Sequence, residues 1–315
     1  MLDFFYFTKY KFYIKFIEEV NLPEYKGSTL RGGSGYILKE IVCTLKYNQC
    51  DECLIKKQCP YSYLFLTPIQ NNSKMMKKYK EAPHPFVIEP DFDLKTNYKK
   101  IEILNFNILL IGKAAEYLPY LVLSYYKLVE KGIGKEKAKY ELIKVTFLNN
   151  GNEIEIYNNK EKKLKNINAS DFKFKTLNYK NISKIKLKFI TPTRLKYNNK
   201  ITSNIEFHII IRNLLRRISA LSYFHCDKYF DVDYKNIIEN SKNIKLISSN
   251  IKWYDWSRYS TRQKSKMHFG GFIGEAWYEG PLEQFIDYLL LGSEIHIGKN
   301  STFGLGKYEV ELIYE

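Results

Sequence analysis

The order of strand-like and helix-like segments repeats along this chain, and this repeat constrains the fold most strongly. In the first half, strands rich in Phe, Tyr and Ile are expected over Phe4–Glu18 and Ile101–Ile111. Helices are expected from Leu30 and over Ala114–Lys131, where apolar residues recur at helical spacing. After the cysteine segment, the proline-rich KEAPHPFVIEP (residues 80–90) is expected to be an extended edge or loop. A hairpin that turns at residues 149–151 follows the second helix. The first half therefore has the order β-α-(insertion)-β-β-α-β.

The second half repeats that order. Its clearest helix has apolar residues that step by 4, 3, 4 and 3 positions, namely Phe207, Ile211, Leu214, Ile218 and Leu221. The other expected elements are a strand at Lys184–Thr191, strands at Lys252–Ser257 and Phe269–Tyr278, a helix from Pro281 to about Leu291, and a final strand at Lys307–Tyr314. A β-α-β-β-α-β order is the ferredoxin-like (RRM-like) pattern.

We therefore predict an α+β protein of tandem ferredoxin-like domains. Residues 1–160 form the first domain, with a Cys-rich insertion at about 43–60. Residues 161–180 are rich in Lys and Asn and are expected to be a linker, and residues 181–315 form the second domain.

The charge of the chain indicates a polyanionic partner. The formal net charge is +16, and aromatic residues make up 16% of the sequence. Such a charge attracts nucleic acid first and an anionic membrane second. A Lys-, Asn- and Ile-rich proteome is the alternative explanation. Because no apolar run reaches the roughly 20 residues of a membrane span, we expect a soluble, cytoplasmic protein without a membrane partner.

Four cysteines are clustered in the insertion. Cys43, Cys50, Cys53 and Cys59 have the spacing C-x6-C-x2-C-x5-C, and the central pair is typical of a tetrahedral zinc site. Four thiolates leave no open position, so a structural rather than a catalytic zinc is expected. An iron–sulfur cluster and unligated cysteines are the alternatives.

Three glycines lie in the first turns of the first expected helix, which Ser28–Thr29 can cap. Gly32, Gly33 and Gly35 each cost about 1 kcal/mol relative to Ala within a helix. Close approach of another backbone or of a phosphate explains such a cluster. The neighbouring Arg31 is then an RNA contact. The alternative is a glycine-rich loop with a later helix start.

A second glycine-rich segment, HIGKNSTFGLGKYEV, lies between the last helix and the last strand. Its spacing and its position exclude a nucleotide-binding P-loop. A cationic loop that approaches a phosphodiester chain is the remaining interpretation. The expected RNA-binding residues in it are Gly298, Lys299, Phe303, Gly304, Gly306 and Lys307.

A basic segment, SRYSTRQKSKM, precedes the strand at Phe269. Arginines beside hydroxyl side chains suit phosphate and ribose contacts. We therefore include Arg258, Arg262 and Lys266 among the expected RNA-binding residues. A solvated edge of a hairpin is the alternative.

These segments resemble the RAMP superfamily of CRISPR-associated proteins, and most closely its repeat-processing endoribonucleases of the Cas6 type. The resemblance is carried by TLRGGSGYILKEIVC, APHPFVIEP, FITPTRLKYN, RRISALSYFH, WYDWSRYSTRQKSKM, GGFIGEAWYEG and HIGKNSTFGLGKYEV. It implies metal-independent cleavage of CRISPR repeat RNA (pre-crRNA), with no cofactor for catalysis. It also implies a catalytic tyrosine or histidine near the first helix in some relatives, which makes Tyr36 a candidate.

Cleavage without a metal uses the 2′-OH of the RNA, and it yields a 2′,3′-cyclic phosphate and a 5′-OH. Histidine suits the base and acid roles near neutral pH. His296 is the first candidate because it directly precedes the Gly298–Lys299 loop. His84, between two prolines, and His268 follow it. The two histidines on the second-half helix, His208 and His225, are expected to be structural.

Three classes of function remain open: the endoribonuclease, a non-catalytic RNA-binding RAMP subunit of a CRISPR effector complex, and a structural or membrane-surface protein. The expected partners are repeat RNA or crRNA and effector complex subunits. Whether the protein forms a homodimer stays open.

Overall fold

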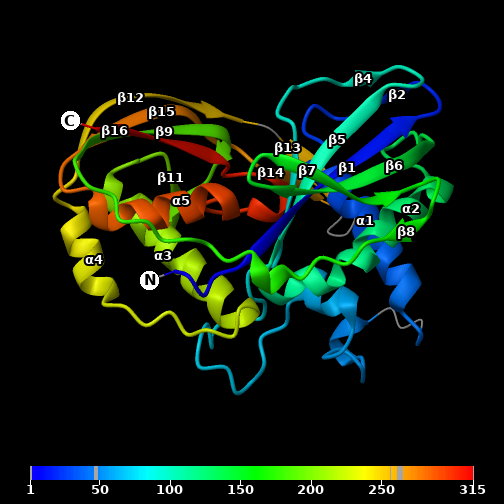
Figure 1. Ribbon diagram of the computed structural model, residues 1–315, viewed down its shortest axis with the longest axis horizontal. Coiled ribbons are helices and arrows are strands. Elements are labelled where there is room, and N and C mark those ends of the chain that lie inside the picture. Colours follow the sequence, from blue (N-terminus) through cyan, green and yellow to red (C-terminus); the bar gives the residue numbers. More distant parts are fainter. Residues whose placement is uncertain (1, 46–48, 256, 261–264, 315) are drawn as a thin grey trace. The chain divides into compact units, whose positions relative to one another are not determined.

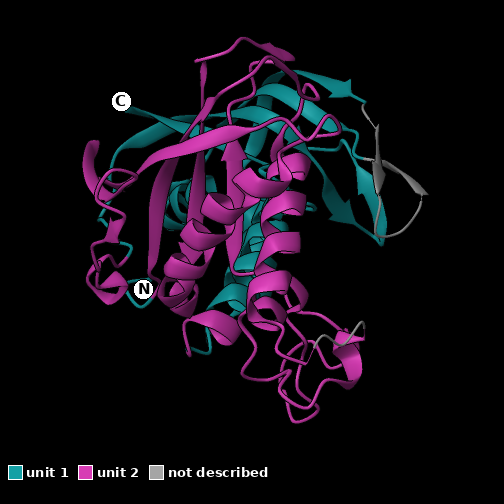
Figure 2. Ribbon diagram, turned by 90° about the vertical axis from the view of Figure 1, so that its right-hand side faces the viewer, with its two compact units in different colours: residues 1–4, 174–222, 228–315 teal, residues 5–173, 223–227 magenta. Residues whose placement is uncertain are grey.

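The computed structural model describes residues 2–45, 49–255, 257–260 and 265–314. The chain divides into two compact units (Figure 2). The amino-terminal unit comprises residues 5–173 and 223–227, and the carboxy-terminal unit comprises residues 1–4, 174–222 and 228–315. The division after Lys173 falls within the segment 161–180, which is short of regular structure apart from a short strand and a single 3₁₀ turn.

The amino-terminal unit combines an antiparallel sheet with long helices (Figure 1). Its elements are β1 (Phe7–Phe16), β2 (Val20–Asn21), α1 (Gly27–Val42), β3 (Phe86–Pro90), β4 (Asn97–Tyr98), β5 (Ile103–Ile111), α2 (Leu118–Lys131), β6 (Tyr140–Asn149), β7 (Asn152–Asn158) and β8 (Lys163–Leu164). The main sheet has the order β3-β5-β1-β6-β7-β8, and β2 pairs with β4 separately.

The carboxy-terminal unit has the same organisation. Its elements are β9 (Ile182–Thr193), β10 (Leu195–Tyr197), β11 (Lys200–Thr202), α3 (Phe207–His225), α4 (Tyr234–Ser241), β12 (Lys245–Tyr254), β13 (Ser257–Ser260), β14 (Ser265–His268), β15 (Gly271–Glu279), α5 (Ile286–Ile295) and β16 (Tyr308–Tyr314). The main sheet has the order β12-β15-β9-β16, and β10–β11 and β13–β14 form separate hairpins. The last residues of α3 belong to the amino-terminal unit.

Both main sheets have the ferredoxin-like strand order. Within each β-α-β-β-α-β set, the second, third, first and fourth strands lie side by side, and all the pairs are antiparallel. The predicted α+β fold of tandem ferredoxin-like domains is confirmed.

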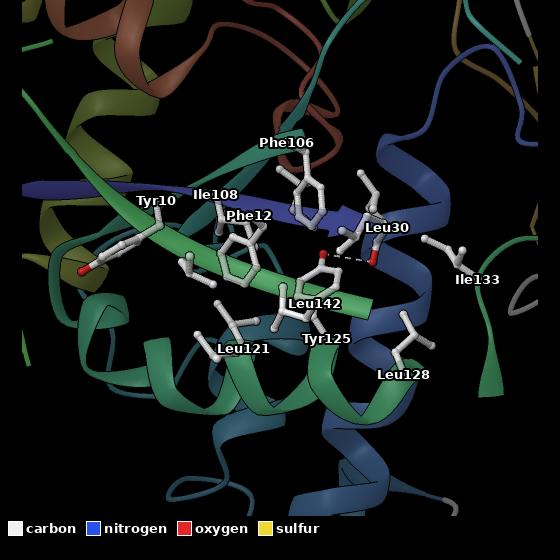
Figure 3. Packing of buried hydrophobic residues seen from close by; sticks show 14 of the residues in the cluster. Tyr10, Phe12, Leu30, Phe106, Ile108, Leu121, Tyr125, Leu128, Ile133 and Leu142 are labelled. Carbon is white, nitrogen blue, oxygen red and sulfur yellow. Dashed lines mark hydrogen bonds between the residues drawn. The ribbon is translucent and has the colours of Figure 1, made fainter. Parts of the chain in front are cut away.

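The alternation along β1 sets the two faces of the amino-terminal sheet. Tyr10, Phe12 and Ile14 are buried, whereas the intervening Lys11 and Tyr13 are half-buried. The buried residues join the core that packs with α1 and α2 (Figure 3). The Tyr125 hydroxyl of α2 donates a hydrogen bond of 3.2 Å to the Leu30 carbonyl of α1 (Figure 3). This bond satisfies a buried hydroxyl and links the two helices.

The start of α1 differs from the prediction. The helix begins at Gly27 after Lys26, and no side chain caps it, so the predicted Ser28–Thr29 cap is wrong. The Lys26 ammonium is buried and lies 2.8 Å from an Asp93 carboxylate oxygen. A buried ammonium needs such a partner, and this ion pair holds the chain at the helix start.

Two glycines of α1 allow close packing. A Cβ at Gly33 would lie 2.7 Å from Leu128 Cδ2 on α2, and one at Gly35 would lie 2.6 Å from Phe65 Cε1. Phe65 lies in a π-helical turn, Ser62–Leu66, that follows the cysteine insertion. At Gly32, nothing lies within 4 Å of an added Cβ. The glycines are therefore part of the helix, and two of them are explained by contacts within the protein.

Whereas α1 begins before the predicted Leu30, two other α-helices begin later than predicted, each after a 3₁₀ turn. The helix expected from Ala114 begins as a 3₁₀ turn at Gly112–Tyr117, and α5 follows another such turn, Glu283–Phe285.

Within the described residues, no helix combines the length and apolar character needed to cross a bilayer.

Substitutions at these glycines should separate packing from propensity. We expect Gly35→Ala to lower the free energy of unfolding by about 1–3 kcal/mol, because the methyl group overlaps the Phe65 ring. Gly32→Ala is the matched control and should raise it by about 0.5–1 kcal/mol, since alanine favours helix and the site is open. Urea unfolding measures both, and equal effects would contradict the packing described here.

Candidate active site

The carboxy-terminal glycine-rich loop is held against its own unit by backbone hydrogen bonds. The Lys299 N–H donates to the Arg194 carbonyl at 3.0 Å, and the Gly306 N–H donates to the Pro192 carbonyl at 3.2 Å. A Cβ at Gly306 would lie 1.8 Å from the Ile297 carbonyl oxygen, and Gly306 has a φ of +75°. Close contact within the protein therefore explains this glycine without a phosphate.

The other residues of this loop divide between its interior and its surface. Gly304 is buried with a φ of +89°, and Gly298 has a φ of +83°. Phe303 packs edge-on against Phe269 with ring centroids 5.6 Å apart, which favours an anchoring role. Lys299 is exposed and Lys307 is half-buried. These cations stay predicted RNA contacts.

His296, the first catalytic candidate, lies inside this loop. Its side chain is fully buried, its φ is +64°, and its Nδ1 lies 3.1 Å from the Leu305 carbonyl oxygen. A buried ring cannot reach a phosphodiester unless the loop opens. These contacts favour the anchoring alternative, so we do not include His296 in the site proposed below.

The basic segment forms the β13–β14 hairpin. Arg258 lies on β13, opposite Met267, and Lys266 lies on β14, opposite Tyr259. Arg262 lies outside the described residues. His208, one of the two histidines predicted to be structural, is half-buried on α3 with its Nδ1 3.3 Å from a Glu206 carboxylate oxygen. Partial burial lowers the pKa of His208.

On the amino-terminal unit, Arg31 and His84 lie against the same aromatic ring. The Arg31 guanidinium lies 5.7 Å from the centroid of Phe86 and 5.1 Å from that of Phe65. The His84 ring stacks on Phe86 at 6.2 Å, and its Nδ1 hydrogen-bonds to the Thr67 hydroxyl. The structure thus brings one predicted RNA contact and one catalytic candidate to the edge where α1 meets β3.

Tyr36 lies on the outer face of α1. Its side chain is 62% exposed, and it follows Gly32 by one helical turn. Nothing lies within 4 Å of a Cβ built at Gly32, so the helix is open at that position as well.

A pocket lies beside His84, and the sequence did not predict it. It has a volume of about 340 Å³, and all its lining residues belong to the amino-terminal unit. Thr67, the hydrogen-bond partner of His84, forms part of its wall together with Tyr63, Tyr223 and His225. No local motif marks this pocket, because its walls come from the cysteine insertion, the following loop and the end of α3.

His225 forms a partly buried hydrogen-bonded pair with Tyr63. The Nε2–H of His225 donates to the Pro83 carbonyl at 2.8 Å, so Nδ1 of the neutral ring accepts from the Tyr63 hydroxyl at 3.1 Å. Burial raises the pKa of Tyr63 well above its ordinary value, which keeps the hydroxyl protonated. The predicted structural role of His225 fits these contacts.

Tyr223 is in a different electrostatic environment. The Lys74 N–H donates to the Tyr223 hydroxyl oxygen at 3.1 Å, and this bond lowers the pKa of the phenol below its ordinary value. Ser73 contributes a weaker effect of the same sign. A hydrogen bond to the oxygen stabilises the ionised form and fixes the ring on the pocket wall.

The four clustered cysteines share one small cavity. Cys43, Cys50, Cys53 and Cys59 are free thiols that line a cavity of about 20 Å³, together with Lys39 and Tyr61 among others. Across the described part of the chain, however, no three His, Cys, Asp or Glu side chains lie in an arrangement ready to hold a metal ion. The geometry therefore does not support the zinc prediction as it stands.

Two family models match the chain. Residues 5–169 match AF_1859_N, described as an N-terminal domain, and residues 187–308 match the CRISPR-associated endoribonuclease Cas6. An uncharacterized protein of Archaeoglobus fulgidus is 22% identical over 307 residues, which cover 94% of each chain.

Solved structures share the fold at low sequence identity. A Cas6 product complex matches with a TM-score of 0.58 and 13% identity, covering 98% of this chain and 99% of that one. A partial Cas6-RT-Cas1–Cas2 complex matches with a TM-score of 0.59 and 13% identity, covering 99% of this chain and 47% of that one. The match to the CRISPR-associated endoribonuclease Cas6 therefore covers residues 187–308, and solved Cas6 structures share the fold of the whole chain, as the resemblance indicated.

Proposed function

We propose that the protein cleaves CRISPR repeat RNA without a metal, by attack of the RNA's own 2′-OH on the adjacent phosphorus. The P–O5′ bond breaks as the new P–O2′ bond forms, leaving a 2′,3′-cyclic phosphate and a 5′-OH. A base takes the proton of the 2′-OH, and an acid gives a proton to the leaving 5′-oxygen. Cationic groups stabilise the charge on the phosphorane.

The observation that carries the proposal is the position of Arg31 and His84 against one ring. The Arg31 guanidinium lies 5.7 Å from the Phe86 centroid, and the His84 imidazole lies 6.2 Å from the same centroid. In this proposal, Arg31 binds the scissile phosphate and His84 carries the proton. An imidazole suits that role because its ordinary pKa is near neutral.

Tyr36 supplies a second group on the same helix. Its exposed hydroxyl, one turn after the open Gly32, is placed to contact RNA that crosses α1. We propose that it binds or protonates the RNA. Lys299 and Lys307, with Arg258, Arg262 and Lys266, contribute phosphate contacts from the carboxy-terminal unit.

One assay tests the reaction itself. With labelled repeat RNA and excess chelator, we expect cleavage that yields a 2′,3′-cyclic phosphate and a 5′-OH. A 2′-deoxy nucleotide at the scissile position should abolish cleavage and leave binding intact, since it removes only the nucleophile. Tight binding without any cleavage of the unmodified RNA would instead support a non-catalytic RAMP subunit. Product ends of another chemistry would contradict the mechanism.

A histidine substitution tests the site. We expect His84→Ala to lower the single-turnover cleavage rate about 10²- to 10⁴-fold with little change in RNA affinity, because general acid–base catalysis contributes this much. The matched control is His208→Ala, on α3 of the other unit, which should stay close to the wild-type rate.

A folding defect would also slow cleavage, so the stability of His84→Ala is measured as well. Urea unfolding of His84→Ala should show the same cooperative transition as the wild type. A well-folded His84→Ala protein that cleaves as fast as the wild type would rule out this site, and Tyr36→Phe would then test the remaining group on α1.

A structural metal is a separate proposal. Its support is the C-x2-C pair and the cavity that Cys43, Cys50, Cys53 and Cys59 share. The thiols would have to move together from their described positions to hold a metal ion. No catalytic step uses this metal. Association with other CRISPR-associated proteins, or as a homodimer, is also part of the proposal.

Metal analysis tests the cysteine site. Protein purified without added metal should hold about one zinc per chain. Cys53→Ser should lose it, whereas Cys226→Ser, outside the shared cavity, should retain it. If the wild-type protein contains neither zinc nor iron, the proposed metal site is wrong.

A further inference from the structure

The pocket beside His84 has the size and lining of a small-molecule site. Its volume of about 340 Å³ lies at the lower end of the range for such sites. Its lining combines aromatic rings, amides, hydroxyls and two lysines, and includes Lys56, Lys57, Tyr63, Gln70, Asn72 and Tyr223. Amides and rings together suit a nucleobase, since they offer both stacking and hydrogen bonds to its edge.

The aromatic wall is fixed before any ligand binds. Tyr63 stacks on Tyr117 with centroids 4.9 Å apart, and its hydroxyl bonds to His225. Tyr223 lies edge-on to Phe224 at 4.9 Å, and its hydroxyl accepts from the Lys74 N–H. A wall held in this way loses little side-chain entropy on binding.

The loop that carries the amides is closed at its base. The Ala82 N–H donates to the Thr67 carbonyl at 2.9 Å, and the Ile69 N–H donates to the Lys80 carbonyl at 3.2 Å. Inside this closed loop, the Ser73 N–H donates to the Gln70 carbonyl at 3.0 Å. Gln70 and Asn72 are therefore presented on the pocket wall by a tied loop rather than by an open one.

The same loop is strongly basic. Four lysines between Thr67 and Ala82 are exposed: Lys74, Lys77, Lys78 and Lys80. Lys57, which lines the pocket, is exposed as well. Like-charged side chains gathered around a pocket favour a ligand that carries phosphates on both sides. A nucleotide within an RNA strand is such a ligand.

We propose that this pocket binds one unpaired nucleotide of the RNA substrate, next to the scissile phosphate. Asn72 and Gln70 read the edge of its base, Tyr63 and Tyr223 form the walls beside it, and Lys56 and Lys57 contact its phosphate. Thr67 joins the pocket to His84, so the bound nucleotide sets which phosphate reaches that histidine. The proposal rests on the proposed function for the identity of the RNA, but nucleotide binding can be measured without cleavage.

The test is a double-mutant cycle between protein and RNA. Repeat RNAs carry a single abasic nucleotide at each position around the cleavage site, together with a 2′-deoxy scissile nucleotide that blocks cleavage. Affinity is measured for the wild type, for Asn72→Ala, and for the matched control Asn71→Ala, an exposed neighbour outside the pocket lining. The same RNAs with a normal scissile ribose are then used for cleavage rates.

We expect one abasic position to weaken wild-type binding about five- to tenfold, and Asn72→Ala to weaken binding of intact RNA similarly. The abasic nucleotide and Asn72→Ala together should weaken binding no more than either change alone. In contrast, the abasic nucleotide should weaken binding to Asn71→Ala as much as it weakens binding to the wild type. The proposed nucleotide pocket would be wrong if the losses of affinity from Asn72→Ala and from the abasic nucleotide multiply at every position. It would also be wrong if no abasic position weakens binding to the wild type. If Asn72 and the abasic position are coupled but the protein does not cleave RNA, the nucleotide pocket is supported and the proposed endonuclease activity is wrong. If the protein cleaves RNA but the two are not coupled, the activity is supported and the nucleotide pocket is wrong.

Discussion

The amino-terminal site depends on the packing of Phe65 against the backbone of Gly35. With no Cβ at Gly35, the Phe65 ring can lie directly against α1, and from there it reaches Phe86 on β3 with centroids 5.0 Å apart. Arg31 covers both rings, and His84 stacks on the second. The rigid helix, the π-helical turn and the edge strand thus position a cation and an imidazole through one hydrophobic contact. The proposed function therefore uses side chains on packed elements rather than on a free loop.

Much of the fold could be predicted from periodicity. The alternation in β1 and the 4-3-4-3 spacing in α3 reflect burial on one face, so the pattern in the sequence and the element in the structure have the same cause. The start of α1 could not be predicted, because the ion pair of Lys26 with Asp93 joins residues far apart in the sequence. The pocket was missed for the same reason: its walls come from three segments, and Tyr63 and Tyr223 resemble any other tyrosines until the chain folds.

The carboxy-terminal loop shows why glycine alone is an ambiguous signal. A backbone that needs a positive φ, or that must approach another carbonyl, requires glycine whether the neighbour is a phosphate or the protein. At Gly306 the neighbour is the Ile297 carbonyl, and His296 beside the loop bonds to Leu305 within it. Histidine next to glycine therefore did not indicate an accessible side chain at His296, whereas His84, between two prolines, is half-buried just before the edge strand β3. The discriminating property is the burial of the side chain, which the local sequence does not encode.

The distribution of ion pairs argues that the net charge acts near the amino-terminal pocket. On the sheet of the carboxy-terminal unit, successive lysines of β9 face carboxylates across the strands: Lys184 with Glu279, Lys186 with Glu311 and Lys188 with Glu309. Paired charges of this kind nearly cancel at a distance, so that face attracts a polyanion weakly. The exposed lysines between Thr67 and Ala82 lie in a loop with one acidic residue, Glu81. Under the proposed function, an RNA strand attracted by that excess of positive charge would bind beside the pocket and His84, the proposed position of cleavage.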